Sequence, residues 1–232
     1  MTVRKRRRIY IVRHGEVDYF TNSTLPSDPA LTLDGIQQSL STARFIAAQK
    51  VKIDRVVAST YLRAKMTAEL IIGELKHTPS MVMDSAFREI GAGDVTALSG
   101  HALSASCFVG MRFVPASSKF MNGERIEEFT ARVNSAMDNL LADLSWNNIL
   151  IVAHGGVNTA LLSRAITGCD RSYIATIEQD YACLNILEVG NGDEDWVLRL
   201  VNYTHDRPLP ENAERTTMER FLQSYIERIN KH

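Results

Sequence analysis

The four residues Arg13-His14-Gly15-Glu16 directly follow the apolar run Ile9–Val12. A short β-branched run predicts a buried strand, and the end of such a strand is where an α/β sheet presents its ligand site. Arginine beside histidine is costly to hold near a core unless an anion or carboxylate satisfies the charge. Gly15 allows a sharp turn and a close approach to a ligand. The stretch therefore predicts an anion site in which His14 could act as a nucleophile.

A second histidine follows a second predicted strand. His154-Gly155-Gly156 comes after the strongly apolar run Ile149–Ala153 and opens a predicted helix. Glycines there would direct backbone N–H groups and the helix N-terminus at an anion, which makes Gly155 a weaker candidate for substrate contact. A lone histidine after a strand is more often structural than catalytic. Two strand–His–Gly edges in one chain favour a shared site.

Two further charged residues lie near predicted strand ends. Arg63 falls near the start of the helix that follows the strand predicted over Ile53–Ala58, and Glu89 follows the short apolar run Met81–Met83. Because the planar fork of arginine suits phosphate oxygens, Arg13 and Arg63 could hold one phosphate-sized anion beside the histidines and the glutamate. The plainer interpretations are a helix-surface salt bridge for Arg63 and a solvated loop carboxylate for Glu89.

Strand and helix patterns alternate along the chain. Strands are expected at the four apolar runs above, and helices over residues 32–48, 60–75, 124–144 and 157–167. Thr32 is the expected N-cap of the first helix, and one apolar face is expected from Leu33, Ile36, Leu40, Ala43 and Ala47. A late hairpin is expected from Ala182–Val189 and Trp196–Val201. This alternation predicts an α/β fold, a three-layer α/β/α sandwich with a mostly parallel central sheet.

Between Gly91 and Gly123 the periodicity dissolves into small residues with scattered methionine and phenylalanine. A segment of this length without a clear pattern is usually a functional lid or binding insertion. The alternative is a small helical excursion that only packs. We therefore expect a single domain over residues 1–232 with a substrate-facing insertion at about 91–123.

Composition narrows the class of protein. The 232 residues are 45% hydrophobic and 23% charged, which is typical of a globular protein with a packed core, and the net charge is −1. That charge attracts neither nucleic acid nor a membrane, and no run approaches the ~20 apolar residues of a membrane span. Cys107, Cys169 and Cys183 lack paired spacing, which favours a reducing, cytoplasmic setting over a disulfide framework. The hydrophobic pattern fits a monomer or a homodimer.

The N-terminal run Arg4-Lys5-Arg6-Arg7-Arg8 is the one strongly basic segment. Only four apolar residues separate it from Arg13, too few for the core of a signal peptide. We interpret the run as a solvated tail that leads into the first strand, with a contact to an anionic partner as the alternative.

Taken together, the motifs resemble the histidine phosphatase superfamily in its phosphoglycerate mutase-like branch, which carries the Arg-His-Gly motif. The resemblance occurs in family order over residues 9–205 and rests on Arg13–Glu16, Leu31–Gln38, Ala58–Ala68, Phe87–Asp94, Gly123–Val133 and Ile151–Val157. It implies a phosphoglycerate mutase-like fold and a phosphatase that acts on a small phosphorylated molecule without a cofactor.

The resemblance also implies a role for each residue. His14 would become phosphorylated, Arg13, Arg63 and His154 would bind the phosphoryl oxygens, and Glu89 would protonate the leaving alcohol and then act as base on water. Phosphoryl transfer needs mainly alignment and charge stabilisation, which two arginines and a second histidine could supply in place of a metal. The arginines should also lower the pKa of His14 and so keep it neutral for attack.

The chain departs from the family pattern at two places. The family often has asparagine six residues after the nucleophile, where this chain has Phe20, so that Thr21 or Asn22 would have to supply the contact to substrate. The family's common Gly-Asp-Trp-Glu-Gly becomes residues 93–97, Gly-Asp-Val-Thr-Ala. Both changes affect the expected substrate more than the expected chemistry.

Three alternatives remain open at this point. A phosphoglycerate mutase would need more basic contacts than Arg112 and Lys119, which are the only ones in the insertion. A degenerate member would bind a phosphorylated ligand or protein without turnover, but all five catalytic positions are filled. A metal hydrolase would draw ligands from His14, His154, His101 or His205, which show no paired metal-ligand spacing.

Overall fold

The computed structural model describes residues 5–19, 28–94, 98–168, 172–191, 194–205 and 215–229. Within these residues a central sheet has six strands in the order β3-β2-β5-β1-β7-β8. The strands are β1 (Arg7–Arg13), β2 (Arg55–Ser59), β3 (Ser80–Asp84), β5 (Asn148–Ala153), β7 (Leu184–Val189) and β8 (Trp196–Tyr203). The first four pair in parallel, while β7 pairs antiparallel with both β1 and β8. The mostly parallel sheet, the central place of β5 and the late hairpin are confirmed.

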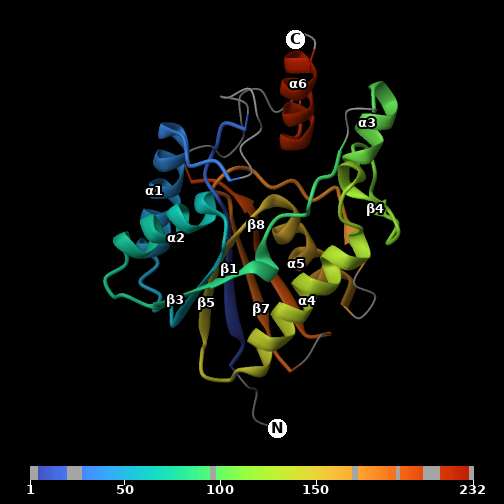
Figure 1. Ribbon diagram of the computed structural model, residues 1–232. Helices are drawn as coiled ribbons and strands as arrows, with labels where there is room; N and C mark the ends of the chain where they lie inside the picture. The colour runs from blue at the N-terminus through green and yellow to red at the C-terminus, as the bar shows by residue number, and fades with distance from the viewer. Residues whose placement is uncertain are drawn as a thin grey trace.

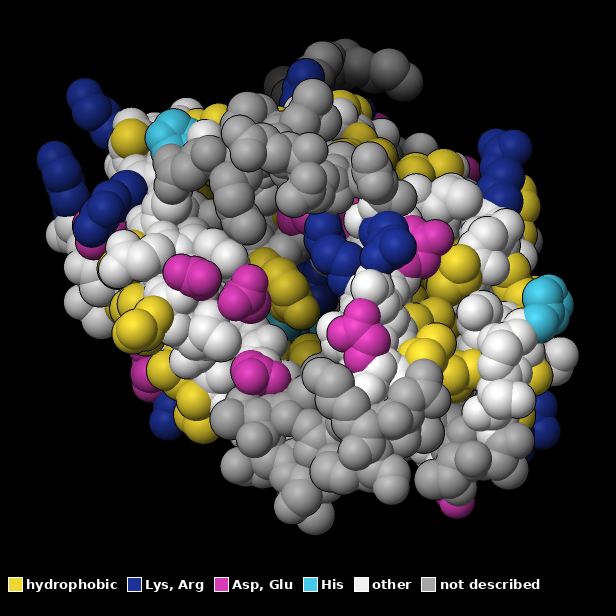
Figure 2. Space-filling model, turned by 90° about the horizontal axis from the view of Figure 1, so that it is seen from above, with side chains coloured by type: hydrophobic (Ala, Val, Ile, Leu, Met, Phe, Trp, Pro, Cys, Tyr) yellow, Lys and Arg dark blue, Asp and Glu magenta, His cyan; other side chains and the backbone are white. Residues whose placement is uncertain are grey.

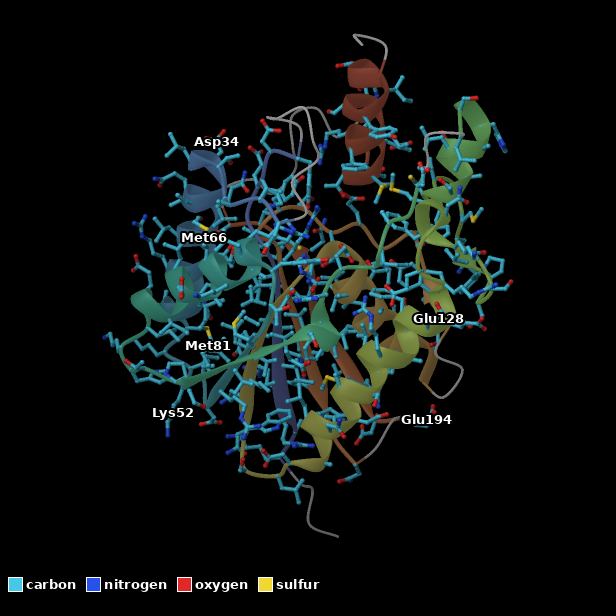
Figure 3. All side chains as sticks on the ribbon, in the orientation of Figure 1. Asp34, Lys52, Met66, Met81, Glu128 and Glu194 are labelled. Carbon is cyan, nitrogen blue, oxygen red and sulfur yellow. The ribbon has the colours of Figure 1, made fainter. Side chains whose placement is uncertain are left out.

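Helices cover both faces of this sheet (Figure 1). Successive residues of β1 face opposite layers: Ile9 and Ile11 join the core with α4 (Ile126–Ala142) and α5 (Gly155–Thr167). Tyr10 and Val12 join the core with α1 (Leu33–Ala48) and α2 (Leu62–Glu74). This alternation is the period of two that a strand imposes. The three-layer sandwich follows, and side chains fill the space between its layers, with Met66 and Glu128 on opposite sides (Figure 3).

The first helix begins as predicted but buries a different face. The Thr32 side chain accepts from the Gly35 amide and caps α1. The buried residues are Gly35, Ser39, Thr42, Ala43 and Ile46, whereas Leu33 is 83% exposed. Of the predicted apolar face, Ala43 is buried and Ile36, Leu40 and Ala47 are half-buried, so the prediction was wrong for Leu33 and the centre of the buried face lies elsewhere. The two hydroxyls can be buried because each has an acceptor: Ser39 donates to the Gly35 carbonyl and Thr42 to the Ala182 carbonyl.

The insertion between residues 91 and 123 has structure of its own. It contains α3 (Gly100–Ser106), β4 (Phe113–Val114) and the 3-10 helix η2 (Phe120–Asn122), and β4 pairs with β6 (Tyr173–Ile174). The C-terminal helix α6 (Thr217–Ile229) was not predicted. It buries Leu222 and Tyr225, and it stands with α3 beyond the end of the sheet opposite the N-terminus (Figure 1).

Within the basic N-terminal run, Lys5 is exposed, but Arg6, Arg7 and Arg8 do not belong to a solvated tail. Arg6 pairs with Asp195, Arg7 donates to the carbonyls of Leu141 and Asp143, and Arg8 pairs with Glu188. Arg7 and Arg8 already belong to β1, and extension of the strand brings their guanidinium groups within reach of these acceptors. Among the described residues, no helix is long and apolar enough to cross a membrane.

Candidate active site

Four parallel strands deliver the predicted site residues to one edge of the sheet. His14 directly follows β1, and Arg63 is the second residue of α2, just past the end of β2. Glu89 follows β3 and the 3-10 helix η1 (Ser85–Phe87), and His154 lies between β5 and α5. Because parallel strands present their carboxyl ends at the same edge, residues distant in sequence meet there. Seen from above this edge, charged side chains surround a hollow in which hydrophobic and histidine atoms are visible (Figure 2).

His14 is held on both ring nitrogens. Its Nδ1 lies 2.7 Å from the Gly15 carbonyl, and its Nε2 lies 3.2 Å from the Nε of Arg63. The ring is 1% exposed. Burial, followed by the charges of Arg63 and Arg13, lowers the pKa of His14 well below its ordinary value of 6.5. The predicted direction is confirmed, but burial contributes more than the arginines to which the prediction assigned it.

His154 lies edge-on to His14, with 5.1 Å between the ring centroids. Its Nε2 is 2.7 Å from the Ser59 hydroxyl, and its buried Nδ1 has no hydrogen-bond partner among the described residues. Burial, and then His14 and the arginines, lowers the pKa of His154 well below 6.5. A second neutral, partly unsatisfied imidazole therefore faces the first.

The two arginines of the site are both buried and both contact tyrosines. The Arg13 guanidinium donates to the Gln179 carbonyl and lies 4.1 Å from the centroid of the Tyr181 ring. The Arg63 guanidinium lies 4.5 Å from the Tyr61 ring and 3.4 Å from the Asp28 carboxylate. Stacking on an aromatic face orients a guanidinium while leaving donors on its edge.

The Glu89 carboxylate contacts the start of α5, directly after His154. Its Oε2 accepts from the Gly156 amide at 3.0 Å, and its Oε1 accepts from the Ile90 amide at 3.0 Å. A Cβ on Gly156 would lie 2.4 Å from the Glu89 carboxylate, so a larger residue here would force the carboxylate to shift. One of the helix amides expected to face a substrate anion is therefore occupied by the protein's own carboxylate.

Three tyrosines and an aspartate at the site were missed by sequence reasoning. Tyr61 lies edge-on to His154 at 5.3 Å, Tyr181 lies 5.9 Å from His14, and Tyr19 lies 5.6 Å from the Arg63 guanidinium. Asp28 accepts from the Leu62 amide and so caps α2 just before Arg63. Only Tyr61 carried a signal, because it sits inside the motif that contains Arg63.

Of the remaining candidates that the structure describes, only Gly155 lies beside the residues described above. Thr21, Asn22 and Phe20 lie outside the described residues, as do residues 95–97 and Cys169. His101 is exposed on α3, and His205 contacts the ring of Phe45. Within the described ranges, no three His, Cys, Asp or Glu side chains gather as a metal-binding group. Gly155 opens α5, where a Cβ would lie 3.6 Å from the Arg13 Nε.

Comparison with known proteins fits this geometry. The sequence profile of the histidine phosphatase superfamily (branch 1) matches residues 9–204. This chain belongs to that superfamily. It is 30% identical over 201 residues to the uncharacterized phosphatase PhoE of Bacillus subtilis, covering 84% of this chain and 93% of that protein. It is 29% identical over 174 residues to the adenosylcobalamin/alpha-ribazole phosphatase of Salmonella typhimurium, covering 69% and 80%.

Solved structures show the same fold in this superfamily. A mycobacterial glucosyl-3-phosphoglycerate phosphatase, solved with VO3, superposes with a TM-score of 0.69 at 23% identity and covers 85% of this chain and all of that one. The chain is therefore a histidine-dependent phosphatase with a phosphoglycerate mutase-like fold.

Proposed function

We propose that this histidine phosphatase hydrolyses a small phosphomonoester through a phosphohistidine on the Nε2 of His14, without a metal ion. The observation that carries the proposal is the pair of contacts on the His14 ring. The Gly15 carbonyl can only accept and the Arg63 guanidinium can only donate. The ring is therefore neutral, with its proton on Nδ1 and a lone pair on Nε2.

In the first step, the Nε2 lone pair forms a bond to phosphorus while the bond from phosphorus to the ester oxygen breaks. Arg13, Arg63 and His154 hold the remaining phosphoryl oxygens, and charge stabilisation of this kind supplies most of the catalysis of phosphoryl transfer. The buried Arg13 Nε and His154 Nδ1 have no partners among the described residues, and a phosphoryl group would satisfy both. Glu89, when protonated, gives its proton to the departing alkoxide.

In the second step, water attacks the phosphohistidine. Glu89, now a carboxylate, takes a proton from the water while the bond from phosphorus to Nε2 breaks, which releases phosphate and restores neutral His14. One side chain thus acts as acid and then as base, as general acid–base catalysis of two successive steps requires.

Two of the similar proteins, the adenosylcobalamin/alpha-ribazole phosphatase and the glucosyl-3-phosphoglycerate phosphatase, are named for small organic phosphates, which supports a substrate of that class. We assign the segment 91–123 to the substrate-facing wall of a single domain, because α3 stands at the end of the sheet where the site lies (Figure 1). In this segment the Arg112 guanidinium lies 5.2 Å from the centroid of the Phe113 ring. Nothing in the part of the chain that the structure describes favours the mutase alternative. The free buried thiols of Cys107 and Cys183 suit a reducing, cytoplasmic compartment.

Hydrolysis of p-nitrophenyl phosphate in excess EDTA tests the proposal. Wild type should keep its activity, His14→Ala should lose it, and His77→Gln, which changes a loop histidine bonded to the Ile53 carbonyl, should behave as wild type. Loss of wild-type activity in EDTA would contradict metal independence, and full activity of His14→Ala would contradict the nucleophile. Turnover of 3-phosphoglycerate to its isomer would favour the mutase instead.

A further inference from the structure

Glu89 lies in irregular backbone between η1 and α3, where no helix or strand fixes its position. Its carboxylate is oriented by the amides of Gly156 and Ile90, but the main chain that carries it needs support of its own. An acid that must meet a leaving oxygen has to be placed within hydrogen-bond reach of that atom.

Arg132, on α4, supplies that support from the amino-terminal side. Its Nη1 donates to the carbonyls of Ala86 and Arg88 at 2.7 and 2.8 Å, and its Nη2 donates to the carbonyl of Glu89 at 3.1 Å. A single guanidinium therefore binds three carbonyls of the segment that ends at the catalytic acid. Lysine could not reproduce this planar, multidentate contact.

Glu124 completes the contact from the other side. Its two oxygens accept from Arg132 at 2.8 and 2.9 Å, and its Oε2 also accepts from the Gly91 amide at 2.9 Å. The Glu124 and Arg132 side chains are only 20% and 27% exposed, so the pair is largely shielded from water. Burial raises the pKa of Glu124, but the hydrogen bonds from Arg132 and the Gly91 amide together outweigh burial. The net effect is a lowered pKa, so Glu124 remains a carboxylate.

The backbone next to Glu124 packs against the same segment. The Glu124 amide donates to the Gly91 carbonyl at 2.8 Å, and a Cβ on Gly123 would lie 2.1 Å from that carbonyl oxygen. The backbone that carries Glu89 is thus held on both sides. Arg132 binds it at Ala86, Arg88 and Glu89, and Glu124 binds it at Gly91.

We infer that Arg132 and Glu124 are positioning residues that hold Glu89 where it can protonate the leaving group. They lie in the stretch Gly123–Val133, a motif of this chain to which the chemistry described above assigns no role. The inference rests on the proposed function, because it requires Glu89 to be the acid. We call Arg132 and Glu124 together the clamp. A displacement of a catalytic group by about 1 Å can cost about 10²-fold in rate, so a substitution in the clamp should lower catalysis before it unfolds the protein.

The leaving group distinguishes a positioning role from a merely structural one. The p-nitrophenolate ion leaves without much need of a proton, whereas the alkoxide of β-glycerophosphate needs one. The ratio of kcat/KM for the two substrates therefore reports on the acid, since kcat/KM covers only the steps up to transfer of the phosphoryl group.

The experiment compares Arg132→Lys and Glu124→Gln with Glu89→Gln and wild type on both substrates, with melting temperature as a check of folding. Arg125→Lys is the matched control, since Arg125 is the N-cap residue of the same helix and its guanidinium donates to the Ser117 carbonyl, not to the segment that carries Glu89. We expect Glu89→Gln to lose about 10²–10⁴-fold on β-glycerophosphate, with a much smaller loss on p-nitrophenyl phosphate. Both clamp variants should show the same selective loss, of at least about tenfold, and the control should not.

Each other outcome overturns something definite. If Glu89→Gln shows the selective loss and a folded clamp variant loses activity equally on both substrates, or not at all, the positioning role is wrong and the proposed function stands. If Glu89→Gln itself shows no selective loss, the acid assignment fails, and the positioning role fails with it. Two clamp variants are used so that if one does not fold, the other decides.

Discussion

The Nε of Arg63 lies 3.2 Å from the Nε2 of His14 and donates a hydrogen bond to it. A histidine that carried a proton on Nε2 could not accept this bond. The contact is possible only while Nε2 holds a lone pair, and the Gly15 carbonyl on Nδ1 keeps the proton on the other side of the ring. The arginine that would bind the phosphoryl group therefore also favours the tautomer in which the proposed nucleophile, Nε2, is unprotonated.

His14 should stay neutral well below pH 6.5, because burial and the charges of Arg63 and Arg13 lower its pKa. Long-range ¹H–¹⁵N spectra of the wild type should show the Nδ1–H tautomer throughout this range. In Arg63→Gln one lowering charge is gone, so the pKa of His14 should rise toward its ordinary value. A titration unchanged by this substitution would show that Arg63 does not set the protonation state.

The folded protein should become less stable as the pH is lowered below 6.5. The pKa values of His14 and His154 are lowered in the folded protein, so the unfolded chain binds more protons in this range and the free energy of unfolding decreases as the pH decreases. Melting temperature measured from pH 7.5 to 5.5 should therefore decline. The decline should be shallower in His154→Gln than in His101→Gln, which changes an exposed histidine of α3. Equal slopes would contradict the linkage.

Arg63→Lys should lower kcat for p-nitrophenyl phosphate by about 10²–10³-fold, the usual cost of removing one donor that stabilises transition-state charge. Lysine keeps the positive charge but loses the planar fork, the stacking on Tyr61 and the contact with the His14 Nε2. Lys65→Arg, on the exposed face of the same helix, is the control. Near-normal kcat in Arg63→Lys would mean that charge alone suffices.

The loop after β1 packs tightly against the start of α1, and two glycines make this possible. A Cβ on Gly15 would lie 2.2 Å from the Gly35 carbonyl, and one on Gly35 would lie 2.1 Å from the Glu16 carbonyl. Either Gly→Ala change should destabilise the protein by about 1–3 kcal/mol, the usual cost of overpacking. Gly73→Ala in α2, with nothing within 4 Å, should instead stabilise it by about 0.5–1 kcal/mol. Urea midpoints measure both, and destabilisation of Gly73→Ala would contradict the helix propensity argument.

The sheet and most helices could be predicted because their signals are local. The runs at Ile9–Val12 and Ile149–Ala153 are apolar over their full length, and Thr32 marks the start of α1 by its own side chain. The buried face of α1 could not be predicted in the same way. Ser39 and Thr42 are buried through acceptors, and Thr42 finds its acceptor 140 residues away at Ala182.

The site residues likewise differ in whether the sequence could predict them. His14 and His154 each follow a recognisable strand, so topology alone brings them to one edge. Arg132 and Asp28 were missed because their partners are backbone groups of distant segments, the carbonyl of Glu89 and the amide of Leu62. Nothing in the sequence near either residue records those partners. The helix α6 was missed although its apolar residues Leu222 and Tyr225 have helical spacing, since no neighbouring motif drew attention to it.

Trapping of the phosphorylated enzyme tests the central claim most directly. The protein is mixed with a ³²P-labelled substrate in EDTA, quenched within milliseconds in alkali, digested and examined by mass spectrometry and ³¹P NMR. We expect one alkali-stable, acid-labile phosphoryl group on the Nε2 of His14, absent from His14→Ala. A phosphoryl group on Nδ1 or on another residue, or turnover without any phosphorylated enzyme, would contradict it.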